Sequence, residues 1–106
     1  KVVTSGYRDT EPDTLRAMGE ELCRIEQNAV VVFSAENDGK LVFTANCGKN
    51  AISRGIKAGD LVREVSKIAG GGGGGRPDSA MAGGKDISKA GAALGFVYEY
   101  VKNITG

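Results

Sequence analysis

Histidine is absent from this 106-residue chain, and cysteine occurs only twice. Without histidine the chain cannot form a Ser-His-Asp triad or a histidine-ligated metal site, and it lacks the commonest general acid and base. Cys23 and Cys47 have no CxxC or CxxH companions, so neither a zinc site nor a thioredoxin-like motif is indicated. We expect both to be reduced, partly buried structural residues. The sequence therefore predicts no catalytic residues and no metal site.

Long apolar runs and an excess of one charge are also missing. No run approaches the roughly 20 apolar residues needed to span a bilayer, so we expect no membrane partner. Fourteen basic residues stand against thirteen acidic ones, which gives a net charge of +1. Bulk charge therefore does not predict nucleic-acid binding, and any anion site must be local.

Size and composition are those of one globular domain. The chain is 41% hydrophobic and 25% charged, and a chain of this length buries roughly two-thirds of its extended surface on folding. The first residue is Lys1, not Met, and a patterned segment follows at once without a signal-peptide hydrophobic region. We interpret residues 1–106 as one domain taken from a longer protein.

The first quarter of the chain predicts a strand followed by a helix. Residues 1–7 contain valines and a tyrosine, and Thr10 or Asp13 can cap a helix that has Pro12 in its first turn. Apolar residues then recur at spacings of three and four, which predicts a core-facing stripe of Leu15, Met18, Leu22 and Ile25.

The middle of the chain predicts a hairpin and a second helix. Residues 29–35 and 41–47 are rich in β-branched and aromatic side chains, and the polar residues between them supply turn chemistry. Residues 48–57 are polar and have room for one short helical turn. Gly59 and Asp60 then form the predicted cap of a second helix, which has Leu61, Val65 and Ile68 on one face.

The last third contains six consecutive glycines, a small-residue strand and a final helix. The glycines are residues 70–75, and the predicted strand is residues 79–84. Asp86 or Ser88 can cap the final helix, whose apolar stripe is Ile87, Ala90, Leu94, Val97, Val101 and Ile104. The predicted fold class is α/β: a single domain with a mixed β-sheet of about four strands, in the order β-α-β-β-α-β-α, covered by helices.

The glycine tract has a functional and a neutral interpretation. As a flexible linker it would leave some 36 residues after it, too few for a separate core, so we expect it to lie inside the fold. There it would let a phosphate approach main-chain N–H groups, with Arg76 as an added donor. It is no Rossmann motif, because it follows a helix and leads to Pro77, and no P-loop, because Arg76 and Pro77 stand where Lys and Ser or Thr are required.

The segment AGDLVREVSKIAGGGGGGRPDSAMAGG, residues 58–84, resembles the C-terminal signature of alanyl-tRNA synthetases. This signature belongs to the DHH-associated domain, which a group of phosphoesterases shares. The family usually has Met where Ser79 stands and Gln where Met81 stands. The phosphoesterase branch typically has His where Arg76 stands, so the arginine favours the synthetase branch.

The resemblance implies a tRNA-binding module without its own catalytic centre. It implies contact with the outer corner of tRNA-Ala, where the D and T loops meet, and help in coupling aminoacylation with editing. The implied partners are tRNA-Ala, other domains of the same synthetase and a second copy in a homodimer, and the implied location is cytoplasmic. No cofactor is expected in this domain; ATP, magnesium and zinc are expected only in the full-length synthetase.

Candidate nucleic-acid-binding residues follow from the resemblance and from local charge. Phosphate and sugar contacts would come from basic side chains and from main-chain N–H groups. The primary candidates are Gly72, Gly73, Gly74, Gly75, Arg76, Lys85 and Lys89. A secondary basic cluster consists of Lys49, Arg54 and Lys57.

Two other functions remain open at this stage. One is the oligonucleotide-binding domain of a DHH-type phosphoesterase. The other is an oligomerisation module that uses the last helix, for which exposure of Phe96, Tyr98 and Tyr100 would be the sign.

Overall fold

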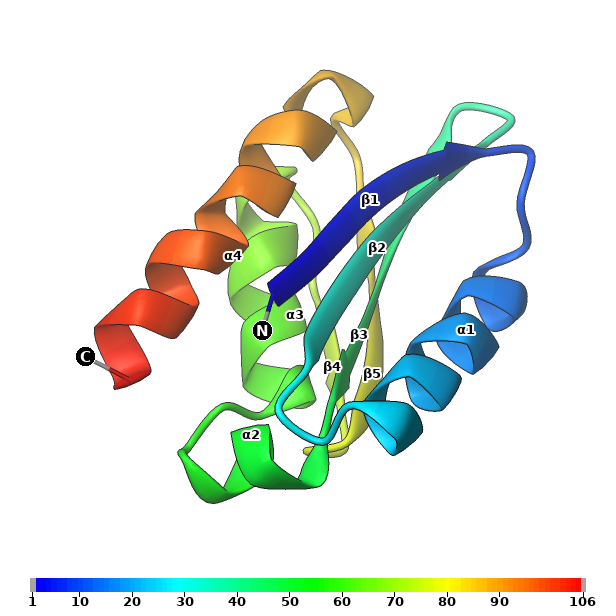
Figure 1. Ribbon diagram of the computed structural model, residues 1–106. Coiled ribbons are helices and arrows are strands. Elements are labelled where there is room, and N and C mark those ends of the chain that lie inside the picture. Colours follow the sequence, from blue (N-terminus) through cyan, green and yellow to red (C-terminus); the bar gives the residue numbers. More distant parts are fainter. Residues whose placement is uncertain (1, 106) are drawn as a thin grey trace.

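The computed structural model describes residues 2–105, which form one five-stranded mixed sheet with helices on both faces (Figure 1). The strand order is β1-β2-β3-β5-β4. Lys1, where the predicted first strand begins, lies outside the described residues. Along the chain the elements are β1 (Val2–Arg8), α1 (Pro12–Ile25), β2 (Val30–Asn37), β3 (Lys40–Cys47), α2 (Lys49–Ser53), α3 (Ala58–Ile68), β4 (Gly73–Gly75), β5 (Ser79–Gly84), η1 (Ile87–Lys89) and α4 (Ala90–Thr105).

The sheet combines one parallel pair with three antiparallel pairs. β1 and β2 are parallel and joined through α1, whereas β2–β3, β3–β5 and β5–β4 are antiparallel. The predicted hairpin is confirmed, with a tighter turn than expected. Only Asp38 and Gly39 lie outside the strands, and both have positive φ, 50° and 77°, as a two-residue turn of type I′ requires.

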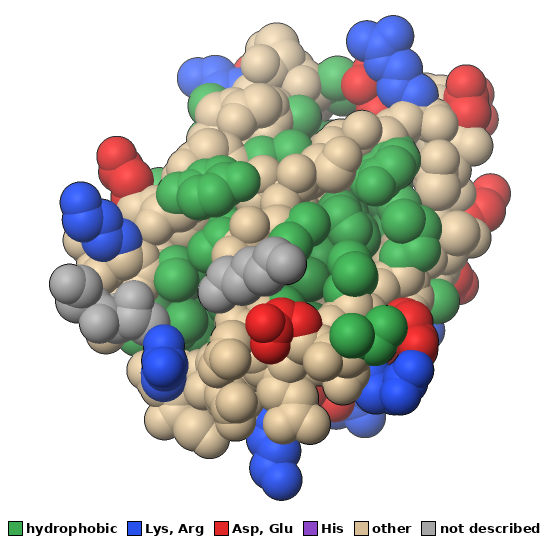
Figure 2. Space-filling model, viewed as in Figure 1, with side chains coloured by type: hydrophobic (Ala, Val, Ile, Leu, Met, Phe, Trp, Pro, Cys, Tyr) green, Lys and Arg blue, Asp and Glu red, His purple; other side chains and the backbone are tan. Residues whose placement is uncertain are grey.

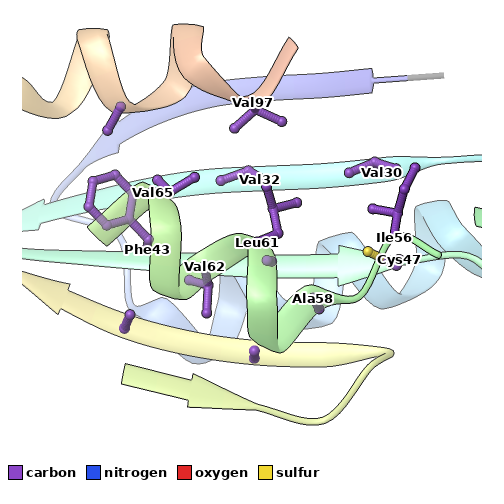
Figure 3. Packing of buried hydrophobic residues seen from close by; sticks show 14 of the residues in the cluster. Val30, Val32, Phe43, Cys47, Ile56, Ala58, Leu61, Val62, Val65 and Val97 are labelled. Atoms are coloured by element: carbon purple, nitrogen blue, oxygen red, sulfur yellow. The ribbon is translucent and has the colours of Figure 1, made fainter. Parts of the chain in front are cut away.

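The main core lies between the sheet and the two helices α3 and α4. Leu61, Val62 and Val65 of α3 are buried in one cluster with Phe43 of β3, in which Val65 lies beside Phe43 and Val97 of α4 packs over β2 (Figure 3). The predicted apolar face of α3 is thus confirmed, and that of α4 is confirmed except for Ile104, which is 37% exposed. Phe96 and Tyr100 are partly buried against this core, and Tyr98 is exposed with its hydroxyl 3.1 Å from that of Thr4. The chain itself therefore covers most of the apolar face of its last helix.

α1 covers the opposite face of the sheet alone, and here the predicted core stripe is wrong. Leu15 is buried, but Met18, Leu22 and Ile25 are 40%, 39% and 70% exposed. The residues of the helix that are buried against the sheet are instead Leu15, Gly19 and Cys23. Gly19 is the reason, because a Cβ there would lie 2.1 Å from Oδ1 of the buried Asn46. The missing side chain lets the helix settle on β3 along a different line.

The apolar side chains of Met18, Leu22 and Ile25 remain exposed on α1, whereas β1 supplies the core beneath this helix. Val3 and Tyr7 of β1 belong to the small core beneath α1, where the Tyr7 ring meets Phe33 edge-on at 5.4 Å. Figure 2 shows hydrophobic side chains gathered on this face between α4 and α1. Among residues 2–105, no helix is long and apolar enough to cross a membrane.

The glycine tract adds a fifth strand to the four that were predicted. β4 consists of glycines alone and pairs with β5, Gly74 standing opposite Met81. A Cβ at Gly71, Gly73 or Gly75 would come within 3 Å of the β5 backbone, whereas one at Gly72 or Gly74 meets nothing within 4 Å. Three glycines therefore permit a close approach that no other residue allows. Composition had indicated a loop because glycine is a poor strand former.

The helix caps differ from the prediction at two of three places. Glu11 and Lys57 occupy the N-cap positions of α1 and α3, without side-chain capping bonds. Thr10 instead donates its hydroxyl to the carbonyl of Arg8. Asp86 behaves as predicted, since its carboxylate accepts from the Ser88 amide at 3.1 Å at the start of η1.

Candidate nucleic-acid interface

The turn between β4 and β5 has a fixed backbone. The Cys47 amide donates to the Asp78 carbonyl at 3.1 Å, the Ala58 amide donates to Pro77 at 2.8 Å and the Gly59 amide donates to Arg76 at 3.2 Å. Strand β3 and the N-terminus of α3 therefore hold this turn from two sides. It lies at the end of the sheet where α2 and the last turn of α1 also lie (Figure 1).

Arg76 projects from this turn as an exposed cation. Its side chain is 76% exposed, and its ion pair with Asp78 is a 3.5 Å contact from Nε to Oδ1. An ion pair of that length between exposed groups is weak, and it leaves most guanidinium donors available. The backbone is thus ordered, while the charge remains available to a ligand.

Two hollows meet at Arg76. The first, which we call the arginine–glycine hollow, has a volume of about 310 Å³ and is lined by Arg16, Gly74, Gly75, Arg76, Ser79, Ala80 and Met81. The second, the mixed-charge hollow, has a volume of about 360 Å³ and is lined by Glu20, Cys23, Arg24, Cys47, Gly48, Lys49, Arg76 and Asp78.

The two hollows differ in charge. The arginine–glycine hollow has two arginines and no acidic residue in its lining. The mixed-charge hollow has three basic residues, from α1, α2 and the β4–β5 turn, together with the carboxylates of Glu20 and Asp78. The first therefore suits a group that only accepts hydrogen bonds, such as a phosphate, and the second suits a group that both donates and accepts.

Helix α1 supplies one wall of both hollows. Arg16, Glu20 and Arg24 recur every four residues and so lie along one side of the helix. Arg16 makes long contacts, 3.7 Å to Asp13 and 4.0 Å to Glu20. Arg24 instead binds Glu21 with both ends of its guanidinium, and this hydrogen bond lowers the pKa of Glu21. Arg16 is the more available of the two arginines.

The two cysteines, Cys23 and Cys47, are uncharged residues in the lining of the mixed-charge hollow. Both are free and buried, as the sequence indicates. Burial raises the pKa of Cys23 to about 11 and that of Cys47 to about 12. Both thiols are therefore protonated at neutral pH, and neither is an activated nucleophile.

The outer edge of β4 offers main-chain donors next to these hollows. Gly83 donates to Gly72 and Arg76 donates to Ser79, which fixes the alternation of the ladder between them. In that alternation the N–H groups of Gly73 and Gly75 point away from β5. By contrast, the amides of Ala58 and Gly59 at the start of α3 are already used by the turn.

The structure brings some of the predicted residues together and separates others. Arg76, Gly74, Gly75 and Lys49 line the two hollows, whereas Gly73, the first residue of β4, and Gly72 before it lie outside both linings. Lys85 directly follows the other end of β5, and Lys89 is the last residue of η1 at that end (Figure 1). Arg54 and Lys57 lie in the connection between α2 and α3, outside the lining of either hollow.

Sequence reasoning missed the two arginines of α1. The four-residue spacing of Arg16, Glu20 and Arg24 was a visible signal for a charged stripe. It did not indicate a site, because such stripes are usually solvated surfaces. The stripe lies near the β4–β5 turn because α1, which connects the parallel strands β1 and β2, packs across the sheet. This arrangement is visible only in the folded chain.

The family match and the sequence relatives of this chain agree with each other. Residues 1–103 match the DHHA1 domain. The chain is 49% identical over 98 residues to an alanine–tRNA ligase of Shouchella clausii and 45% identical over 102 residues to one of Alkaliphilus oremlandii. These alignments cover 92% and 96% of this chain but only 11% and 12% of the ligases. The chain thus spans about a ninth of the length of the curated relatives it matches.

Solved structures agree at two levels of similarity. The C-Ala domain of Aquifex aeolicus alanyl-tRNA synthetase superposes with a TM-score of 0.85 at 30% identity, covering 99% of this chain and 91% of that one. A DHH-domain protein described as a member of a family of ribosomal proteins superposes with a TM-score of 0.60 at 12% identity, covering 88% of this chain and 22% of that one. The second similarity shows the fold alone.

Proposed function

The chain belongs to the DHHA1 domain family, and we propose that it acts as the tRNA-binding C-terminal module of an alanine–tRNA ligase. It corresponds to the C-terminal domain of such ligases and not to their catalytic domain. Its task would therefore be to hold tRNA-Ala at the outer corner while other domains perform aminoacylation and editing.

One observation supports this proposal above the others: cations from three separate elements converge on a rigid turn. Arg16 of α1, Lys49 of α2 and Arg76 of the β4–β5 turn line two adjoining hollows, although the net charge of the chain is only +1. Phosphate contacts of this kind supply affinity without reading base identity. A surface that recognises a folded corner by its shape needs this type of contact.

The remaining partners follow from the same proposal. ATP, magnesium and zinc would bind elsewhere in the ligase, and the module would work in the cytoplasm, where protein synthesis occurs. A homodimer is compatible with the exposed apolar side chains of α1, Met18, Leu22 and Ile25.

A phosphoesterase-type oligonucleotide site is the second candidate. The fold similarity to the DHH-domain protein is compatible with it, and the arginine–glycine hollow would be the place where a short strand binds. Arg76 stands where that branch typically has histidine, and the sequence relatives named above are ligases. Both points favour the tRNA module.

A salt-titrated binding assay distinguishes the two functions. The chain would be tested against transcribed tRNA-Ala, the same tRNA with its D-loop and T-loop contacts disrupted, and a short single-stranded RNA. Preference for the intact corner is expected. Equal or tighter binding of the short strand would favour the phosphoesterase branch, and no binding by the folded chain would contradict both functions.

A further inference from the structure

The two hollows at Arg76 adjoin but have different chemistry, and this difference suits the repeating unit of RNA. In RNA each ribose is bonded directly to a phosphate on either side. A strand with a phosphate in the arginine–glycine hollow would therefore bring a ribose to its neighbour, since Arg76 lines both.

We propose that the mixed-charge hollow binds a ribose 2′-hydroxyl, with the Glu20 carboxylate as its hydrogen-bond acceptor, so that the site distinguishes RNA from DNA. The proposal rests on the proposed function and names the ribose as the group recognised in this hollow. Among the groups of a nucleic-acid backbone, the 2′-hydroxyl is the one that separates RNA from DNA.

The charges of the mixed-charge hollow disfavour a second phosphate there. A phosphodiester carries acceptors only, and Glu20 and Asp78 would repel it. A hydroxyl can donate to a carboxylate and accept from a cation at the same time. Lys49 is available as that cation, because it forms no ion pair with any carboxylate among the described residues.

Glu20 is free enough to take a new partner. Its side chain is 56% exposed, and its contact with Arg16 is 4.0 Å long. Binding a phosphate would draw Arg16 towards the arginine–glycine hollow, since Arg16 lines that hollow. Glu20 would then lose its cation and gain the hydroxyl. The volume of about 360 Å³ lies within the range of sites that hold small organic groups, and the protonated thiols add no charge.

The test combines a protein variant with single-atom changes in the RNA. Transcripts of tRNA-Ala would carry one 2′-deoxy substitution at a time in the D and T loops, and each would be titrated against the wild-type chain and Glu20→Ala. We expect one or two positions at which the substitution weakens wild-type binding about fivefold to tenfold, the net worth of one typical solvent-accessible hydrogen bond. For Glu20→Ala, the same 2′-deoxy substitutions should weaken binding by less than about twofold.

Glu64→Ala is the matched control, because it also removes one negative charge from an exposed helical ion pair, on the opposite face of the sheet. It should keep the wild-type sensitivity. Glu20→Gln retains a carbonyl acceptor, so it should recover part of the sensitivity to 2′-deoxy substitution that Glu20→Ala loses. The proposal is overturned if no single deoxy position matters to the wild type, or if Glu20→Ala stays as sensitive as the wild type. In both cases tRNA binding itself would persist, whereas failure of the proposed function would appear as no binding of unmodified tRNA-Ala.

Discussion

At the scale of single residues, Arg76 joins an ordered backbone to an available charge. Its carbonyl accepts from Gly59 and its amide donates to Ser79, so its Cα is fixed. Among residues 2–105, the one ion pair of its guanidinium is the 3.5 Å contact with Asp78. Little entropy is lost when a phosphate replaces that contact, because the backbone is already ordered. A large share of the binding energy should therefore depend on this one side chain.

Replacing Arg76 with alanine should weaken tRNA-Ala binding by roughly 1–3 kcal/mol, the worth of a charge-assisted contact. Arg76→Lys should recover part of the loss, since lysine keeps the charge but not the planar fork. Filter binding at fixed salt measures the effect. Arg63→Ala is the control, because Arg63 is also exposed and paired with a carboxylate three residues away, on α3. Equal losses for Arg76→Ala and Arg63→Ala would remove Arg76 from the interface.

The buried thiols predict how stability depends on pH. Their pKa values are raised from 9.0 in the unfolded chain to about 11 for Cys23 and about 12 for Cys47 by burial. The unfolded chain thus loses these protons first, and the free energy of unfolding falls as pH rises from 9 through 11 to 12. Below pH 9 this contribution is fully present.

Urea denaturation between about pH 8 and pH 11 measures the predicted decline. Cys47→Ala should reduce the slope of this decline with pH, because the alanine has no proton to lose. The comparison concerns slopes, so a constant loss of packing in the variant does not affect it. Parallel curves for the two proteins would contradict the burial argument.

At the scale of elements, β4 is a strand built from glycine for two different purposes. Gly73 lies where a Cβ would stand 2.7 Å from Cα of Ala82, and its φ is 156°. Gly74 faces open space above Met81 and lines the arginine–glycine hollow. One residue permits the strand pairing, and its neighbour keeps the hollow open.

Single substitutions should separate these two roles. Gly73→Val should destabilise the chain by about 2 kcal/mol or more through a clash and an unfavourable φ. Gly74→Ala should change stability by less than about 1 kcal/mol, since the added methyl group meets nothing. Chemical denaturation measures both. Equal stability of the two variants would show that residues 70–75 act as a linker.

The arginines of α1, Arg16 and Arg24, should contribute to tRNA binding independently of the glycines of β4. We expect Arg16→Ala to weaken tRNA-Ala binding by about 1 kcal/mol, less than Arg76→Ala, because Arg16 lines one hollow and Arg76 lines both. The slope of log affinity against log salt concentration should decrease by about the amount that corresponds to one phosphate contact. Fluorescence anisotropy over a range of salt concentrations measures this. An unchanged salt slope would exclude α1 from the interface.

The elements that sequence predicts best are those with side chains that fill space. The hairpin, α3 and α4 follow from runs of Val, Leu and Phe that are buried as expected. The orientation of α1 could not be predicted, because it depends on the absence of a side chain at Gly19 above Asn46. Hydrophobic periodicity counts Leu22 and Ile25 but gives a glycine no weight. The fifth strand was missed for the same reason.

In the whole molecule, the site forms where one side of α1, the start of α2 and the β4–β5 turn meet. Arg76 and the glycines were predictable as a local run of residues. Arg16 and Arg24 were not, because they lie more than fifty positions away in the sequence. Lys85 and Lys89 lie near Arg76 in sequence but not in space, since β5 is extended and its six residues span roughly 20 Å.

The proposed function requires tRNA-Ala to bind at the Arg76 end of the β4–β5 pair. Amide spectra of the isotope-labelled chain, recorded while tRNA-Ala is added, test this most directly, because each backbone N–H reports its own surroundings. We predict that the signals of Gly74, Gly75, Arg76 and Lys49 shift or broaden first, while those of Lys85 and Lys89 change least. Changes confined to the Lys85 end, or to the exposed face of α4, would show that tRNA-Ala binds away from Arg76.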